Sequence, residues 1–171
     1  GGSNNLNDGS YTLYYQTSNG DGINQTPYGD VASWADSDWY VGLDHTPDNI
    51  DGAEPGRMLI VNADYDPGIF YQATINGVTP GVEVTYGFSV INLMRTDHPN
   101  IANKKKPQVA IAVYDPNGSL IALESSGLIE PTDASNPAGD WITLETTFVS
   151  TSSQFTIQLI NDQDGGDGND L

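Results

Sequence analysis

The sequence contains no cysteine, which excludes disulfides, thiol catalysis and thiolate metal sites. Basic residues are scarce too: five lysines and arginines are outnumbered by 23 aspartates and glutamates, and the formal net charge is −18 at pH 7. This charge argues strongly against nucleic acid as a partner, because phosphates would be repelled, and it disfavours anionic membrane surfaces. No apolar run approaches the roughly 20 residues of a membrane-spanning helix, so membrane insertion is not expected.

Signatures of catalysis are also missing. His45 and His98 are the two histidines, and neither lies in an H-E-x-x-H or comparable array. No G-x-S-x-G nucleophile motif occurs, and no glutamate sits in an obvious apolar pocket that would raise its pKa. The sequence therefore predicts a protein that is not an enzyme. A hydrolase with paired carboxylates remains the third alternative, since distances between carboxylates are not visible in a sequence.

What the sequence does contain is a series of short β-rich segments between clusters of Gly, Pro, Asn and Asp. Strands are expected at residues 10–17, 57–63, 68–75, 82–93, 108–115, 119–126, 140–150 and 154–161. Short turns between them predict an all-β fold, an antiparallel two-sheet β-sandwich. No repeat or linker divides the chain, so residues 1–171 are expected to form one module. The lack of an initiator methionine suggests that this module is excised from a larger extracellular protein.

The acidic segment DQDGGDGND at 162–170 is the first candidate site. Its side-chain oxygens come from Asp162, Asp164, Asp167, Asn169 and Asp170, and the glycines between them leave backbone carbonyls exposed. Calcium prefers carboxylate and carbonyl oxygens of this kind. The alternative is a flexible, solvated tail, because carboxylates this close repel one another without a cation. The segment NKKKP at 103–107 holds three of the basic residues and is expected to be a solvated loop that offsets nearby carboxylates.

The second candidate site lies in the least strand-like region, residues 19–55, where long loops are expected. Sugar rings present apolar C–H faces to aromatic planes, and Asp and Arg side chains bond their hydroxyls. The sequence therefore predicts a ligand-binding set of Trp34, Asp36, Asp38, Trp39, Tyr40 and Arg57. The alternative, which is favoured for Trp39, is that Trp39 and Tyr40 begin a strand and belong to the core. Trp141 is expected in the core because of its strand context.

Several motifs together resemble a known group of modules. They are LDHTP at 43–47, GRMLIVNADYDPG at 56–68, PGIFYQATINGVTPGVEVTYGFSVINL at 67–93, PQVAIAVYDPNGSLIA at 107–122 and the segment from DWITLETTF to GGDGNDL at 140–171. In this order they are similar to the jelly-roll modules of bacterial surface and secreted multidomain proteins, which are related in layout to carbohydrate-binding modules. The resemblance covers roughly Trp39 to Leu171.

The resemblance implies a jelly roll, a non-catalytic binding or adhesive role, and a structural calcium between the first loops and the last strand. It places the loop at 42–52 near the end of the sandwich, so that Asp44 and Thr46 become further candidate calcium ligands; the alternative there is an Asx-type turn. Such modules continue past GGxGNDL into an ALDDI-type strand that pairs with the N-terminal strand and adds an acidic metal ligand. An edge without that strand would be open to pairing.

These features together predict a calcium-stabilised, non-catalytic binding module of a bacterial surface or secreted protein, extracellular or at the cell surface. Its expected partners are a glycan or another cell-surface ligand, and neighbouring domains of the same polypeptide. The alternative is a structural spacer of a large adhesin that has no ligand of its own. Exposed aromatic rings in a groove would favour the binding module, whereas burial of Trp34 and Trp39 would favour the spacer.

Overall fold

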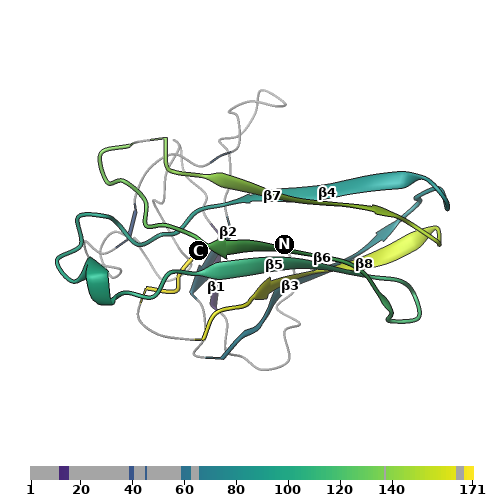
Figure 1. Cartoon of the computed structure of the whole chain (residues 1–171), viewed down its shortest axis with the longest axis horizontal. Helices are drawn as coiled ribbons and strands as arrows, with labels where there is room; N and C mark the ends of the chain where they lie inside the picture. The colour runs from purple at the N-terminus through teal and green to yellow at the C-terminus, as the bar shows by residue number, and fades with distance from the viewer. Residues whose placement is uncertain are drawn as a thin grey trace.

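The computed structural model describes residues 12–15, 39–40, 45, 59–62, 66–136, 138–164 and 168–171 (Figure 1). The strands in this part of the chain are β1 (Thr12–Tyr15), β2 (Leu59–Asn62), β3 (Gly68–Asn76), β4 (Glu83–Val90), β5 (Gln108–Tyr114), β6 (Leu120–Leu128), β7 (Ile142–Val149) and β8 (Gln154–Asn161). A short 3-10 helix, η2 (Ile101–Asn103), follows β4. No helix among these residues is long and apolar enough to cross a membrane.

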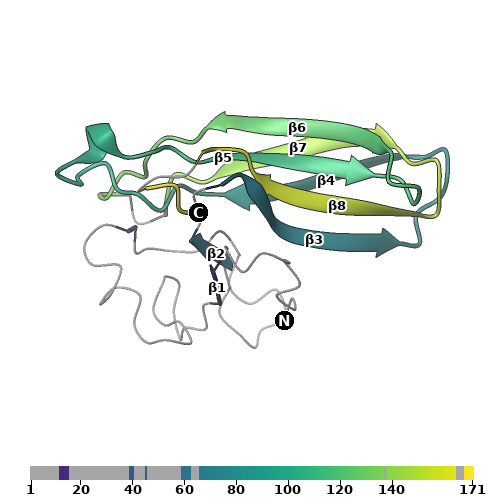
Figure 2. The same cartoon turned by 90° about the horizontal axis from the view of Figure 1, so that it is seen from below.

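Two antiparallel sheets pack face to face as a sandwich, which confirms the predicted fold class (Figure 1). One sheet has the strand order β3–β8–β5–β6, seen side by side in Figure 2, and the other consists of β4 and β7. The antiparallel pairs are nested along the chain, with β5–β6 innermost, β4–β7 around it and β3–β8 outermost. This nesting is the pairing of a jelly roll. β1 and β2 pair separately.

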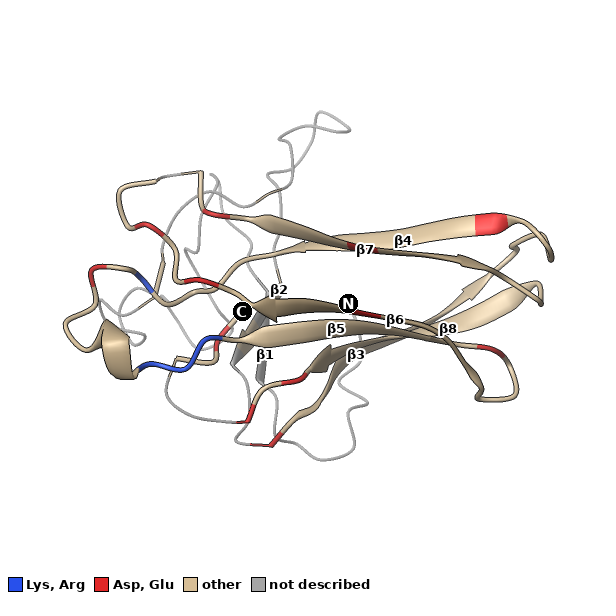
Figure 3. Cartoon of the chain, viewed as in Figure 1, with Lys and Arg blue, Asp and Glu red and all other residues tan. Residues whose placement is uncertain are grey.

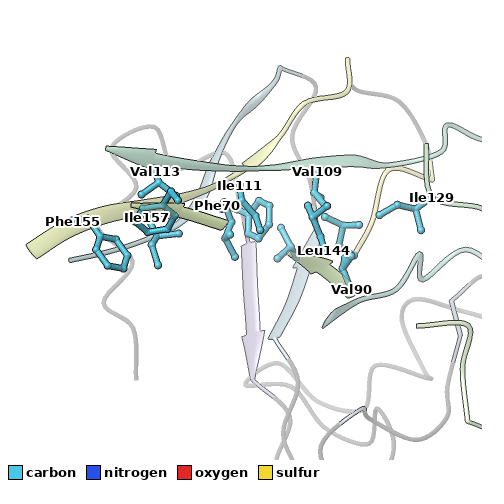
Figure 4. Close-up of a cluster of buried hydrophobic side chains, with 13 residues drawn as sticks. Phe70, Val90, Val109, Ile111, Val113, Ile129, Leu144, Phe155 and Ile157 are labelled. Atoms are coloured by element: carbon cyan, nitrogen blue, oxygen red, sulfur yellow. The ribbon is translucent and has the colours of Figure 1, made fainter. Parts of the chain in front are cut away.

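Alternating side chains build the core between the sheets. In β8, Phe155, Ile157 and Leu159 are buried, and the polar residues between them are more exposed. β5 lies between β8 and β6, so its small outward residues Ala110 and Ala112 are buried as well. The core side chains of both sheets meet in one cluster, drawn in Figure 4, that includes Phe70, Val90, Val109, Ile111, Val113, Leu144 and Phe148.

Asp115 organises the predicted PNG turn between β5 and β6. Its Oδ1 accepts hydrogen bonds from the backbone N–H groups of Asn117 and Ser119, both at 2.8 Å. Gly118 has a φ of 83°, a conformation that glycine adopts without strain. The hydrogen bond from Ser119 is the largest cause that lowers the pKa of the Asp115 carboxyl, and the bonds from Asn117 add to it. The Asp-Pro-Asn-Gly sequence therefore determines the turn of this hairpin, and it could be recognised before the structure was known.

Candidate functional site

The outer face of the four-stranded sheet carries amides and hydroxyls and no acidic residue. The register places Gln72 opposite Gln158 and Thr74 opposite Thr156, all pointing away from the core. Glu124 is the only acidic residue in these four strands, and it pairs with the core residue Ile111, which places it on the inner side. We call this surface the neutral face; its polar members are Gln72, Thr74, Asn76, Tyr114, Ser125, Gln154, Thr156 and Gln158.

Hydrogen bonds between strands order the neutral face. Gln158 Nε2 donates to Gln72 Oε1 at 2.7 Å, and the hydroxyls of Thr74 and Thr156 lie 3.4 Å apart. The outer face of β4 and β7 differs, because Glu83 and Glu145 point outward there. Figure 3 shows acidic residues mostly in loops and at the ends of strands. On a chain of net charge −18, an acid-free face of ordered amides is a distinct surface.

Backbone and side-chain hydrogen bonds hold the acidic end of the chain. Asp162 N donates to Gln108 O at 2.8 Å, and Asp162 Oδ2 accepts from Gln108 Nε2 at 3.0 Å, while Asp162 and Asp164 remain exposed. Asn169 is only 1% exposed, and neither its Oδ1 nor its Nδ2 has a hydrogen-bond partner within the described residues. Asp170 Oδ2 accepts from Trp39 Nε1 at 3.2 Å. Asp167 lies outside the described residues.

The segment at 103–107, which we call the lysine loop, lies against this acidic end. Gly168 has a φ of 102°, and a Cβ built on it would lie 2.9 Å from Lys104 Cβ and 3.1 Å from the Lys105 carbonyl oxygen. Gln163 Nε2 donates to Lys106 O at 3.3 Å, and Lys106 Nζ forms an ion pair with Glu130 at 2.7 Å. The loop expected to offset carboxylates therefore lies next to the acidic end of the chain. No group of three or more acidic, histidine or cysteine side chains with metal-ligand geometry occurs among the described residues.

The structure describes two residues of the predicted ligand-binding set, Trp39 and Tyr40. Trp39 and Tyr40 are 6% and 2% exposed: Trp39 forms a bridge with Met94, and Tyr40 N donates to Leu93 O at 2.6 Å. Neither ring presents a face to solvent, so a stacking role for these two has no support, and the core alternative for Trp39 is the better description. The other four residues of the ligand-binding set lie outside the described part of the chain: Trp34, Asp36, Asp38 and Arg57. Two predicted calcium ligands, Asp44 and Thr46, lie outside it as well.

A cleft of about 400 Å³ is lined by residues of β2, β3, β4 and β8 and by loop residues near their ends. Trp141 lines it and is half-buried, which corrects its predicted place in the core; its ring centroid lies 5.6 Å from that of His45. Tyr71 and Tyr86 also line the cleft, and burial, with a smaller effect of Tyr71, raises the pKa of the Tyr86 phenol. The described lining contains no Asp or Glu, so these residues offer no pair of carboxylates for glycoside hydrolysis.

Sequence reasoning missed both the neutral face and the cleft. The neutral face depends on the register between β3 and β8, which no local motif encodes. The cleft depends on residues from β2, β3, β4 and β8 that are far apart along the chain. The one available signal was the lack of acidic residues at alternate positions of the segments 68–76 and 154–161, in a chain rich in them elsewhere.

Comparison with known proteins adds one distant likeness. No family model matches the chain, and no curated protein matches it either. A matching solved structure is the C-terminal domain of EclA, described as a sugar-binding protein. It is 19% identical, the alignment covers 74% of this chain and 82% of that one, and the TM-score is 0.42. A likeness this distant does not carry a ligand or a binding site from that protein to this one.

Proposed function

We propose that this chain is a non-catalytic binding module of a bacterial surface or secreted protein, and that its neutral face binds an uncharged glycan. The observation that supports this is the absence of acidic residues from the outer face of the four-stranded sheet on a chain of net charge −18. Phosphorylated or sulfated ligands would be repelled by the whole molecule. A neutral ligand that approaches this face meets no carboxylate within the four strands.

The chemistry of the neutral face suits sugar hydroxyls. The amide of each glutamine and asparagine both donates and accepts hydrogen bonds, as does each hydroxyl, and so does every hydroxyl of a sugar. Tyr114 and the exposed Leu123 add apolar surface for the C–H side of a ring. Since a single neutral hydrogen bond contributes only about 0.5–1.5 kcal/mol net, several sugar units along the strands are needed for useful affinity.

A charge placed on the neutral face tests this proposal. A glycan array identifies an uncharged ligand, and titration calorimetry then compares Gln158→Glu with the parent chain. We expect affinity to fall at least about tenfold, because the carboxylate accepts but cannot donate to a hydroxyl at that position. Thr147→Glu adds the same charge to the outer face of β7 and should bind like the parent. Equal losses in both variants would contradict the assignment of the site to the neutral face.

The spacer of a large adhesin is the second candidate function, and burial of Trp39 and Tyr40 favours it. A spacer needs a rigid sandwich and no ligand. Under this alternative no glycan on the array binds. Binding of any uncharged glycan that Gln158→Glu weakens and Thr147→Glu does not would exclude the spacer as the sole role.

Calcium is the proposed cofactor of the acidic end. Asn169 is the supporting observation, because a buried amide without a partner costs stability unless something satisfies it, and a bound cation would engage its Oδ1. Asp162, Asp164 and Asp170 lie in the same segment, and Asp167, Asp44 and Thr46 are further proposed ligands. A bound calcium would supply charge neutralisation that holds this segment against the lysine loop; it has no part in bond-making chemistry.

Removal of calcium is expected to lower the melting temperature. A cation at a hundredfold excess over its Kd stabilises by about 2.7 kcal/mol, which corresponds to about 5–10 °C for a domain of this size. Thermal melts with calcium and with a chelator measure the shift. Asn169→Ala should lose most of it, and Asp133→Asn, outside the acidic segment, should retain it. No shift in the parent chain would exclude calcium and leave the neutral-face proposal untouched.

A further inference from the structure

The neutral face has a polar half and an apolar half, which two neighbouring rows of outward side chains make visible. The first row crosses β3, β8, β5 and β6 in that order and consists of Gln72, Gln158, Ala112 and Leu123. The second row crosses the same strands and consists of Thr74, Thr156, Tyr114 and Leu120. Figure 2 shows these four strands side by side. In both rows amides or hydroxyls lie on β3 and β8, and apolar or aromatic side chains lie on β5 and β6.

The two glutamines of the first row form a pair that can hold an amide group of a ligand. Gln158 Nε2 donates to Gln72 Oε1 at 2.7 Å. This bond does not use the acceptor Gln158 Oε1 or the two N–H donors of Gln72 Nε2. A ligand amide complements both, because its N–H can donate to Gln158 while its carbonyl oxygen accepts from Gln72. A single hydroxyl has both functions on one atom, so it fits two separated partners less well.

The apolar half suits a methyl group attached to that ligand amide. Leu123 is 59% exposed and Leu120 is 52% exposed, so both present apolar surface to a ligand. In a planar trans amide the methyl group lies on the side of the N–H and opposite the carbonyl oxygen. With the carbonyl over β3 and the N–H over β8, the methyl therefore points toward β5 and β6. A hydroxyl in the same place would exchange its hydrogen bonds with water for contact with leucine, which is unfavourable.

We propose that the neutral face selects sugars that carry an acetamido group, such as uncharged chains of N-acetylated hexosamine. The acetamido N–H donates to Gln158, its carbonyl oxygen accepts from Gln72, and its methyl group packs toward Leu123. This inference rests on the proposed glycan-binding function and names the substrate class of the same site. The net charge of −18 agrees with it, because acidic sugars of similar size would be repelled by the whole molecule.

Two tetrasaccharides test the acetamido preference. The β-1,4-linked tetramers of N-acetylglucosamine and of glucose share their linkage and ring configuration. They differ only at carbon 2 of each unit, which carries an acetamido group in one and a hydroxyl in the other. Titration calorimetry is expected to show that the acetamido chain binds the parent protein at least about tenfold more tightly than the glucose chain.

Two substitutions each remove one part of the contact. Gln72→Met keeps a side chain of similar length but removes the donor to the acetamido carbonyl, and Leu123→Ser removes the apolar contact of the methyl group. Each should reduce the preference for the acetamido chain at least about threefold. Val149→Ser removes an apolar side chain of the smaller sheet, 50% exposed, and should keep the full preference. Melting curves of the three variants verify that they are folded.

The outcomes separate this inference from the function on which it rests. Equal affinity for the two tetramers, or a preference for the glucose chain, overturns the acetamido inference and leaves glycan binding in place. Binding of neither tetramer also overturns the inference, and an array without any bound uncharged glycan overturns the proposed function with it. A preference that Val149→Ser loses as well would place the acetamido contact away from Gln72 and Leu123, which contradicts the proposal. A preference that only Gln72→Met and Leu123→Ser reduce supports it.

Discussion

Phe155→Ala is expected to lower the free energy of unfolding by about 3–5 kcal/mol. Phe155 is 2% exposed in β8, and its ring meets that of Phe148 in β7 edge-to-face, with centroids 4.9 Å apart and planes at 83°. The pair therefore spans the two sheets, so truncation leaves a cavity between them and removes the aromatic contact. Urea unfolding followed by tryptophan fluorescence measures the loss as a lower midpoint at an unchanged slope.

Val149→Ala is the matched control for this prediction. Val149 is next to Phe148 in the same strand but 50% exposed, so its truncation creates no cavity and should cost less than about 1 kcal/mol. A domain of this size has a total stability of roughly 5–15 kcal/mol, so Phe155→Ala removes a large share of it. Equal losses in the two variants would mean that contact between the sheets does not hold the fold together.

Fold class and strand positions could be predicted because both depend on local patterns. Consecutive residues are enough to recognise the alternation of apolar and polar side chains in β8 and the Asp-Pro-Asn-Gly turn after β5. Strand ends could not be predicted in the same way. The apolar pattern runs to Leu93, but β4 ends at Val90, because the side chain of Asn92 turns back to bond Met94 N and the distant Ile129 O.

Sites that depend on register lie beyond such patterns. Gln72 and Gln158 are 86 positions apart and meet only because β3 and β8 pair in one register. Sequence patterns of sugar-binding sites point to tryptophans and aspartates, and they placed Trp39 in the predicted ligand-binding set. In the fold Trp39 is buried, and its backbone forms a bridge with Met94. The acidic end could be recognised because its oxygens are adjacent in sequence, although the position of the lysine loop beside it could not.

The distribution of charge links the candidate sites to the fold. The neutral face has no acidic residue, and most of the carboxylates of the described residues lie in loops and at strand ends (Figure 3). Mutual repulsion there opposes compaction, and no disulfide counters it. The lysine loop lies against Gly168, next to the acidic end of the chain. The proposed cation would stabilise this end of the sandwich, where Asp170 and Leu171 are hydrogen-bonded to Leu93 and Val61.

Asn92→Ala is expected to destabilise the fold by about 2–6 kcal/mol, since two buried backbone groups lose their partners at about 1–3 kcal/mol each. Asn92 is 0% exposed; its Nδ2 donates to Ile129 O at 2.9 Å, and its Oδ1 accepts from Met94 N at 2.8 Å. Its own carbonyl accepts from Thr132 Oγ1 at 2.6 Å. One side chain thus ties the end of β4 to the segment at 129–132, and urea unfolding measures its contribution.

The matched control is Asn76→Ala, at the exposed end of β3, which should change stability by less than about 0.5 kcal/mol. The position of Asn92 also gives the prediction a functional consequence. Leu93, the next residue, bonds both Tyr40 and Asp170, so loosening this turn should weaken the support of the acidic end. The calcium-dependent gain in melting temperature should therefore shrink in Asn92→Ala and persist in Asn76→Ala. If Asn92→Ala lost stability but kept the full calcium response, the two features would be independent, and the turn at Asn92 would serve the sandwich alone.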